Sequence, residues 1–250
     1  RLGYGGAETG CYDLAHYLAE NRCSSYKVTS GGELIKYIDK KKVKLIKLPV
    51  QSKNPLLILL NSLILILVIL FFNISIVHAR SRAPAWSCLF ATKITRRKFV
   101  TTFHGTYNFK NSLKKYYNSV MLKSDLIIAG SNFIFSHINE NYGDFFLNRK
   151  RKLLVIFRGI NANYFNPQKI SLSKIEKFSK KNSIDRNKFI ILLPGRLSFW
   201  KGQKIFIEAL KLLSEQNNNQ PFEGIILGDD QGRSVYKKQL IALIEQYRLK

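Results

Sequence analysis

The sequence predicts an α/β protein built on parallel sheets. Short runs of apolar, β-branched residues alternate with longer segments of helical period along almost the whole chain, which is typical of repeated strand–helix units. In 250 residues, 46% are hydrophobic and 12% aromatic, which is enough for packed cores and too much for wholesale disorder. Because strand–helix–strand connections are right-handed, we expect doubly wound, Rossmann-like sheets.

In the first part of the chain, strands are expected where β-branched runs end at glycines or polar turns, and helices where the apolar period is near 3.6. The expected strands are 26–30, 43–50, 74–79, 98–104, 125–129 and 153–157, and the expected helices are 7–22, 55–72, 84–95, 113–123 and 133–142.

The pattern pauses at residues 161–170, which show neither period and contain an Asn-Pro pair, so a linker is expected there. After it we expect helices at 172–181, 205–215 and 235–247, strands at 189–194 and 224–227, and a turn at 217–220. The sequence thus predicts two domains, residues 1–167 and 168–250, the second only partly present.

The segment 55–72 could be mistaken for a membrane span, because it holds 15 apolar side chains interrupted by Asn61 and Ser62. A span needs about 20 apolar residues, and a strand pattern follows almost at once. A buried helix is therefore the favoured interpretation, and a membrane anchor is the alternative.

The net charge of +25 raises the hypothesis of nucleic-acid binding. Residues 1–167 carry 25 basic and 8 acidic side chains, and residues 168–250 carry 16 and 8, so the two halves share the excess in proportion to length. A dedicated nucleic-acid binder concentrates its charge, so we expect no nucleic-acid partner. Attraction to anionic substrates or to an anionic membrane surface stays open.

Cysteine use indicates a reducing compartment, and hence a cytoplasmic protein. The three residues Cys11, Cys23 and Cys88 form no C-x-x-C pair and no zinc-binding spacing with the four histidines. The chain starts at Arg1 directly before a glycine turn, so we expect a fragment that lacks the first strand of its domain.

Turns at the carboxyl ends of strands are where open α/β sheets bind ligands. Gly5 and Gly6 lead into a helix, where backbone N–H groups could approach a phosphate; the alternative is an ordinary tight turn. His104 follows a buried strand and could hydrogen-bond a sugar hydroxyl or a developing oxyanion, or serve only as a structural hydrogen-bonding group.

A further turn carries Arg196 and Lys201, five residues apart between a strand and a helix. A planar guanidinium, an ammonium and helix N–H groups could hold a diphosphate without a metal; the alternative is a pair of solvated surface charges. Asp229 and Asp230 stand in another such turn, but no other candidate ligands are near in sequence, so no metal site is expected.

Several of these turns occur in the order found in one enzyme family. The segments are GGAE at 5–8, HARSR at 78–82, TFHG at 102–105, RGI at 158–160, FNP at 165–167, PGR at 194–196, WKGQ at 200–203 and GD at 228–229. Along its whole length the chain resembles a bacterial GT-B glycosyltransferase of the family 4 (group 1) type.

The resemblance implies an acceptor-binding first domain, a donor-binding second domain, and retaining transfer of a hexosyl unit from a nucleotide-diphosphate sugar with no metal or other cofactor. It implies that Arg196 and Lys201, with Gly5 and Gly6, hold the donor diphosphate in a crevice between two domains, and that His104 is the catalytic side chain beside the transferred sugar. No enzyme nucleophile is implied, because the leaving phosphate is thought to help deprotonate the acceptor.

By the same resemblance, Arg80 and Arg82 either contact an anionic acceptor or brace the end of their strand. The acceptor is expected to be a glycan or a lipid-linked glycan of cell-envelope polysaccharide or lipopolysaccharide synthesis, at the inner face of the cytoplasmic membrane. The sequence ends before the two glutamates with which the family holds the donor, so this piece alone is expected to be inactive. A nucleotide-sugar 2-epimerase, a sugar phosphorylase and a non-enzymatic membrane-anchored binding protein are the alternatives.

Overall fold

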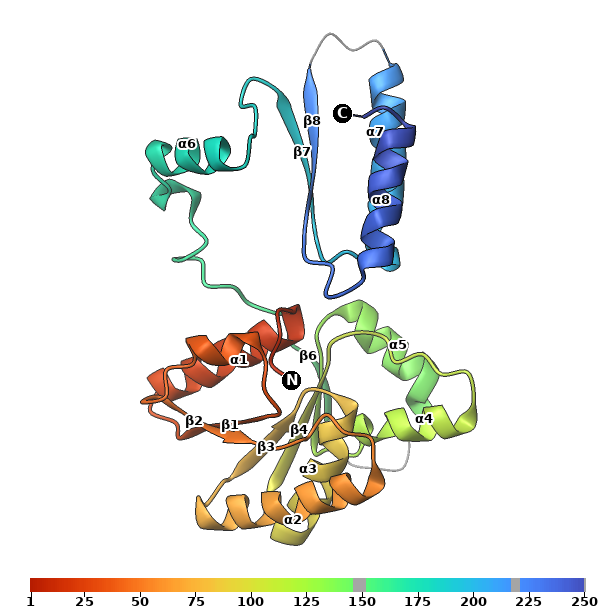
Figure 1. The fold of residues 1–250 in the computed structure, drawn as a ribbon. Coiled ribbons are helices and arrows are strands. Elements are labelled where there is room, and N and C mark those ends of the chain that lie inside the picture. Colours follow the sequence, from red (N-terminus) through yellow and green to blue (C-terminus); the bar gives the residue numbers. More distant parts are fainter. Residues whose placement is uncertain (146–151, 217–220, 250) are drawn as a thin grey trace. The chain divides into compact units, whose positions relative to one another are not determined.

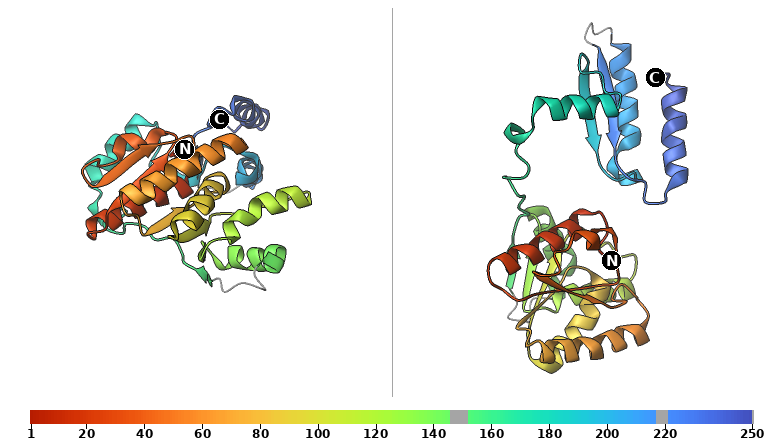
Figure 2. Two further views of the ribbon diagram at one scale, coloured as in Figure 1. Left: turned by 90° about the horizontal axis from the view of Figure 1, so that it is seen from below. Right: turned by 60° about the vertical axis from the view of Figure 1, so that its left-hand side comes forward.

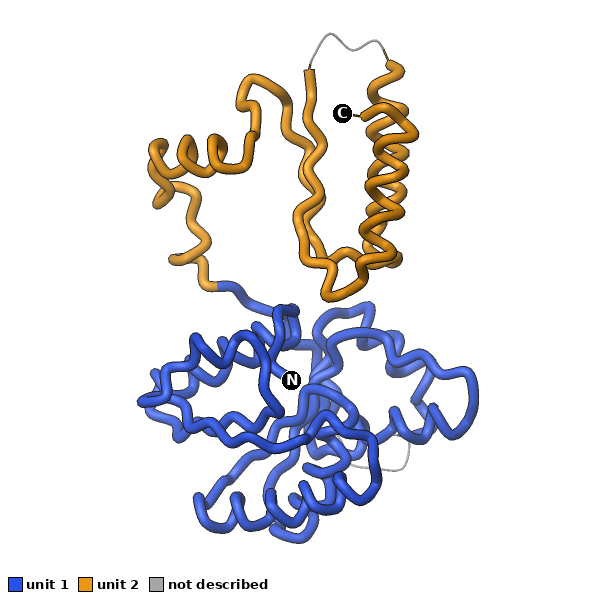
Figure 3. Tube along the Cα trace, in the orientation of Figure 1, with its two compact units in different colours: residues 1–160 blue, residues 161–250 orange. Residues whose placement is uncertain are grey.

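The computed structural model describes residues 1–145, 152–216 and 221–249. These residues form two compact units, residues 1–160 and 161–250 (Figure 3). The division falls at the start of the segment expected to be a linker.

Unit 1 alternates strands and helices as expected, and Figure 1 shows the order along the chain. Its helices and strands are α1 (Gly6–Glu20), β1 (Ser25–Thr29), β2 (Val43–Lys47), α2 (Pro55–Phe71), β3 (Ile76–Ala79), α3 (Arg82–Thr95), β4 (Lys98–Phe103), α4 (Ser112–Asn118), β5 (Leu126–Ala129), α5 (Asn132–Tyr142) and β6 (Lys152–Val155). Short 3₁₀ helices lie at Glu33–Tyr37, Ser119–Leu122 and Gly143–Phe145.

All strand pairs in unit 1 are parallel, which confirms the predicted fold class. Strands β3, β4, β5 and β6 form a four-stranded sheet in that order, and β1 pairs with β2. In a parallel sheet all carboxyl ends face the same edge, so the residues that follow β3, β4 and β6 come together there.

The larger core of unit 1 is an apolar cluster made by strands β3–β5, helices α2, α3 and α5 and the 3₁₀ turn at Ser119–Leu122. Phe103, Ile127 and Ile138 in it are fully buried. Three helices and the sheet thus share one interior. Because helices cover the strands, the strands can be apolar on both faces and need not alternate apolar with polar residues.

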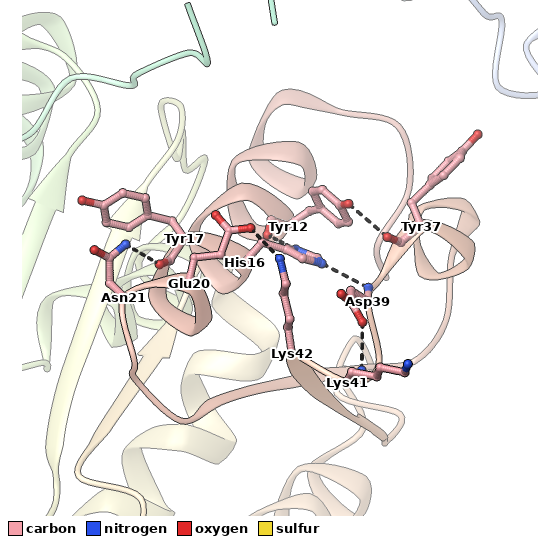
Figure 4. A network of polar contacts seen from close by, with 9 residues as sticks. All are labelled: Tyr12, His16, Tyr17, Glu20, Asn21, Tyr37, Asp39, Lys41 and Lys42. Atoms are coloured by element: carbon pink, nitrogen blue, oxygen red, sulfur yellow. Dashed lines mark hydrogen bonds and ion pairs between the residues drawn. The ribbon is translucent and has the colours of Figure 1, made fainter. Parts of the chain in front are cut away.

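A second, smaller cluster packs α1 against β2 and the 3₁₀ helix at Glu33–Tyr37, and a polar network closes its edge (Figure 4). Nδ1 of His16 donates to the Tyr12 carbonyl (2.9 Å), and Nε2 accepts from the backbone N–H of Asp39 (3.2 Å). The Tyr12 hydroxyl donates to the Tyr37 carbonyl (3.0 Å). A neutral imidazole therefore joins α1 to the segment before β2.

The prediction of a buried helix at 55–72 is wrong for one face. Helix α2 turns its two polar residues inward: Asn61 donates to the Pro49 carbonyl (3.2 Å), and Ser62 donates to the Ile58 carbonyl (2.7 Å). Its leucines cover the outer face, where Leu67 is 67% exposed. Apolar composition alone does not show which face of a helix is covered, because that depends on the neighbouring elements. In the part of the chain that is described, no helix combines the length and the apolar character needed to cross a membrane.

The helix expected at 113–123 is divided into α4 and a 3₁₀ turn at Ser119–Leu122. All four residues of that turn are buried. A regular helix with one inner face cannot bury four consecutive residues, so the chain tightens where it enters the core.

Unit 2 contains α6 (Leu172–Lys181), β7 (Phe189–Pro194), α7 (Gln203–Glu215), β8 (Phe222–Leu227) and α8 (Ser234–Gln246), with 3₁₀ turns at Pro167–Lys169 and Phe199–Lys201. Strands β7 and β8 are parallel, and helices α7 and α8 run side by side next to them (Figure 2). Leu197, Ile207 and Leu240 form the centre of its core. The turn expected at 217–220 lies outside the described residues.

Candidate active site

At the carboxyl edge of the unit 1 sheet, His104 and Arg158 are in direct contact. His104 follows β4, Arg158 follows β6, and Nη2 of Arg158 donates to Nδ1 of His104 at 2.8 Å. A guanidinium has no lone pair to accept a hydrogen bond, so Nδ1 must be the acceptor and Nε2 carries the proton. The contact therefore selects one tautomer of a neutral imidazole.

Electrostatics keep this histidine neutral. Burial lowers the pKa of His104 to about 3, and the positive charges of Arg80 and Arg158 act in the same direction. Among the described residues, no hydrogen-bond partner reaches the buried Nε2. His104 is thus a neutral imidazole whose buried Nε2–H is not paired with any described residue, and it does not serve as a charged acid at neutral pH.

The glycines at the start of α1 lie against the same charged groups. A side-chain carbon at Gly6 would lie 2.6 Å from Nη1 of Arg158, and one at Gly10 would lie 3.1 Å from Nη2 of Arg80. The Glu8 carboxylate lies against Gly5. Gly5 is the N-cap residue of α1 and, as a glycine, has no side chain with which to cap the helix. Small residues here give both guanidiniums room beside the helix N-terminus, in addition to any role towards a phosphate.

Arg80 and Arg82 have different surroundings, although both were expected to contact an acceptor or brace the strand end. Burial lowers the pKa of Arg80, and the positive charge of Arg158 acts in the same direction. Its buried Nε has no partner among the described residues. Arg82 instead donates to Oδ1 of Asn118 (2.7 Å) and lies over the ring of Tyr107. Arg80 thus lies with the group around His104, whereas Arg82 joins the start of α3 to the end of α4 and to the segment that follows β4.

His78 supports the same edge from β3. Its Nε2 lies 2.7 Å from Oγ1 of Thr102 on β4, and burial, with Arg80 and Lys27 nearby, lowers its pKa to about 4. His78 and Arg158 were not predicted as site residues, although both lie in segments that carry the family resemblance. The feature of the sequence that could have identified both residues was their position at strand ends.

In unit 2, the turn after β7 carries Arg196 and Lys201, both exposed. Nη1 of Arg196 donates to Oε1 of Gln231 (2.9 Å), and the Lys201 side chain passes over Gly195. The fully buried Gln203 donates to the carbonyl of Arg196 (3.0 Å), which fixes the turn from below.

Helix α7 begins directly after this turn. Its N-cap residue, Gly202, has a positive φ of 77° and forms no side-chain cap. The N-cap residue thus offers no side chain to the first N–H groups of α7. Because these N–H groups follow a turn that carries two cations, Arg196 and Lys201, the arrangement favours the binding of an anion.

The paired aspartates after β8 shape their own turn. Asp229 accepts from the N–H of Gln231 (2.6 Å), and Asp230 accepts from the N–H of Gly232 (2.8 Å). Across the described ranges, no group of three or more histidine, cysteine or acidic side chains is placed to hold a metal ion.

Comparison with known proteins identifies the family. The model of Glycosyltransferase Family 4 matches residues 4–164, and that of Glycosyl transferases group 1 matches residues 174–250. The chain belongs to glycosyltransferase family 4. This match confirms the predicted family resemblance. A separate comparison with curated proteins found no match.

Solved structures similar to this family 4 chain confirm the GT-B architecture. A glycosyltransferase from Rickettsia africae is 40% identical with a TM-score of 0.84, over 98% of this chain and 63% of that one. HepE from Anabaena, solved with UDP-glucose, is 22% identical with a TM-score of 0.77, over 98% of this chain and 64% of that one. A UDP-N-acetylglucosamine 2-epimerase described as putative, from Listeria monocytogenes, is 10% identical with a TM-score of 0.59, over 97% and 64%.

The family 4 chain thus spans less than two thirds of the length of each of these structures. At 10% and 22% identity, the likenesses to the epimerase and to HepE concern the fold alone. Because one fold supports both glycosyl transfer and epimerisation, the two activities have to be distinguished by the residues of the site.

Proposed function

We propose that the full-length protein is a retaining glycosyltransferase that moves a hexosyl unit from a nucleotide-diphosphate sugar to a glycan or lipid-linked acceptor. The observation that carries the proposal is the turn of Arg196 and Lys201 at the start of α7, whose helix has no side-chain cap. Membership of glycosyltransferase family 4 and the binding of UDP-glucose by HepE, a protein of the same fold, support it.

The chemistry of the donor diphosphate suits this turn. Negative charge grows on the leaving diphosphate as the glycosidic bond breaks, and a preorganised guanidinium, ammonium and helix N-terminus stabilise that charge. Two protein cations and backbone N–H groups supply the neutralisation that a divalent metal gives in other transferases, so we propose that no metal is required.

For unit 1 we propose that the uncommitted N–H of His104 donates to an oxygen of the transferred sugar or of the acceptor. A neutral donor of this kind lowers the energy of developing negative charge without itself changing protonation state. Arg158 holds the imidazole in the required tautomer. We further propose that backbone N–H groups at Gly5 and Gly6 approach the donor phosphates. No side chain is assigned as a nucleophile.

The wider context is proposed from the family resemblance. The acceptor would belong to cell-envelope polysaccharide or lipopolysaccharide synthesis, and the enzyme would act in the cytoplasm as a peripheral protein at the inner face of the membrane. Arg80 is the candidate contact to an anionic acceptor, because its partly buried guanidinium lies with the group around His104.

The test is a screen of nucleotide sugars with the full-length protein, in which released nucleoside diphosphate and glycosylated acceptor are both measured. The Arg196→Ala/Lys201→Ala variant should lose at least about 100-fold in kcat/KM, because two charge-assisted contacts to the leaving group are removed. The control, Lys181→Ala/Arg186→Ala, removes the same two charges from exposed positions of unit 2 and should behave as the wild type.

Three results would contradict the proposal. Release of nucleoside diphosphate that is unaffected by Arg196 and Lys201 would remove the assigned donor site. Conversion of the nucleotide sugar to its 2-epimer with no acceptor present would favour the epimerase. Inversion of the anomeric centre in the product, read by NMR, would exclude retention.

A further inference from the structure

The outer face of α2 is covered by aliphatic side chains. Along its 17 residues the exposed side chains are apolar at helical spacing, one to each turn or closer: Leu56, Leu59, Leu60, Leu63, Leu67, Leu70 and Phe71. We call these seven residues the leucine face. Helix α2 lies on the outside of unit 1, and its inner side packs on α3 (Figure 1). A continuous apolar strip of this kind indicates a contact surface, because isolated exposed leucines would not line up.

The stretch of sequence that contains α2 carries charge of one sign only. Residues 40–124 contain 16 lysines and arginines and no aspartate or glutamate. This stretch supplies nearly all of the net charge of the first 167 residues, so the even distribution between the two halves of the chain hides a strong local excess. The leucine face lies within the most basic stretch of unit 1.

Cations stand at both ends of the helix. Lys53 precedes its N-cap, and at the other end Arg97 donates to Oδ1 of Asn73 (2.8 Å), two residues after α2. Arg97 also borders a hollow of about 420 Å³ at the amino ends of β4 and β5. Five cations line this hollow: Lys93, Arg96, Arg97, Lys98 and Lys123.

The hollow is suited to an anionic group. Its one acidic side chain, Asp125, already accepts a hydrogen bond from the N–H of Phe99 (2.8 Å). The five cations of the hollow outnumber this single carboxylate, so a phosphate group would be attracted there.

From this arrangement we propose that α2 docks unit 1 on a bilayer that contains anionic phospholipids. The leucine face enters the boundary between headgroups and acyl chains, and the surrounding cations, those of the hollow included, bind lipid phosphates. The helix lies along the surface and does not span it, since it has 17 residues and its inner side packs on α3. The inference rests on the proposed function, because a lipid-linked acceptor is presented at such a surface.

Charge complementarity distinguishes a bilayer from a second copy of this chain. Each copy carries a net charge of +25, so pairing two leucine faces would bring two basic stretches together. An anionic surface instead neutralises the same charges.

The experiment measures cosedimentation of the full-length protein with vesicles of phosphatidylcholine alone and of phosphatidylcholine with 30% phosphatidylglycerol. The Leu63→Gln/Leu67→Gln variant should bind the anionic vesicles about tenfold or more weakly, because two inserted side chains become polar without a change of charge. The matched control, Leu113→Gln/Phe133→Gln, changes two apolar residues elsewhere in unit 1 that are at least as exposed as Leu63 and Leu67, and it should shift binding less than about twofold. Circular dichroism and the melting temperature identify a variant that does not fold.

A second arm tests the cations. Lys93→Gln/Arg96→Gln should weaken binding to the anionic vesicles and reduce its salt dependence, whereas Lys181→Gln/Arg186→Gln in unit 2 should not. Equal binding of wild type and leucine variant would overturn the proposal, as would equal binding to neutral and anionic vesicles. A self-association seen by sedimentation that the leucine variant abolishes would assign the face to a second copy.

The docking proposal can fail separately from the proposed function. Donor turnover with a water-soluble acceptor, measured without vesicles, should be the same in wild type and the leucine variant. If vesicle binding follows the leucine face but no nucleotide sugar is turned over, the transferase assignment fails and the docking surface stands.

Discussion

Arg158 donates from Nη2 to Nδ1 of His104 at 2.8 Å, and this one contact determines which imidazole nitrogen carries the proton. Gly6 borders the other terminal nitrogen of Arg158, where an added methyl group would lie 2.6 Å away. The position of the guanidinium therefore depends on the absence of a side chain in the first turn of α1.

Replacing Gly6 by alanine should consequently reduce transfer with little effect on folding. The displaced atom is the end of a flexible side chain, so the melting temperature should stay within about 2 °C of wild type, while kcat falls about tenfold or more as the tautomer is no longer held. Steady-state kinetics and thermal unfolding measure both. Gly143→Ala, where an added methyl group meets nothing within 4 Å, is the control; an equal loss of kcat there would refute the explanation.

Changing Arg80 and Arg82 to alanine, one at a time, should have two different effects. Arg82 makes a hydrogen bond with the fully buried Asn118, so its loss should destabilise unit 1 by about 1–3 kcal/mol and leave KM for the acceptor unchanged. Arg80→Ala should raise KM for an anionic acceptor at nearly unchanged stability. Thermal unfolding together with acceptor titration tests the pair, and the opposite assignment of effects would reverse the two roles.

His78 should make unit 1 less stable in mild acid. Its folded-state pKa is lowered from 6.5 to about 4, so the unfolded chain takes up a proton between these values and the native protein does not. The stabilising contribution is complete above pH 6.5 and is lost as the pH falls towards 4, by about 2 kcal/mol at pH 5.

Urea unfolding at pH 7.5 and pH 5 measures this difference. His78→Gln keeps a polar group next to Thr102 but does not titrate, so part of the pH dependence should disappear in that variant. An unchanged pH dependence would show that His78 does not contribute. His104, whose pKa is also lowered, should account for the remaining slope in the same direction.

Gly228→Ala should damage unit 2 more than Gly195→Ala. A side-chain carbon at Gly228 would overlap the backbone carbonyl of Gly195, which cannot move without parting the ends of β7 and β8. At Gly195 it would lie 3.9 Å from the Lys201 side chain, an ordinary contact. We expect a loss of about 2 kcal/mol or more for the first and under about 0.5 kcal/mol for the second. Hydrogen exchange of the β7 and β8 amides measures both, and equal protection in the two variants would contradict the prediction.

Most of the fold could be predicted from the sequence, because strands and helices of an α/β protein differ in period and in length. The strand at Lys98–Phe103 and the helix at Gln203–Glu215 agree with expectation to within two residues. The short 3₁₀ helix at Glu33–Tyr37 was not predicted, since five residues are too few to show a period.

Only some residues of the candidate site could be named from the sequence. His104 and Arg196 were singled out because glycines and charged residues in turns at strand ends are visible in a sequence. Arg158 and Gln231, which contact them, were not assigned, because a pairing across 54 or 35 residues depends on which strands become neighbours.

By itself the sequence determined the alternation of strands and helices, the parallel sheets and the family, because these depend on local period and on motifs that are contiguous in the chain. Only the tertiary structure decided that α2 turns most of its leucines outward and its asparagine inward. It also decided that Arg82 is committed to Asn118, and that no described residue pairs with the Nε2 of His104. Those outcomes follow from which surfaces the fold brings together, and a side chain's neighbours are set by packing between elements that are distant in sequence.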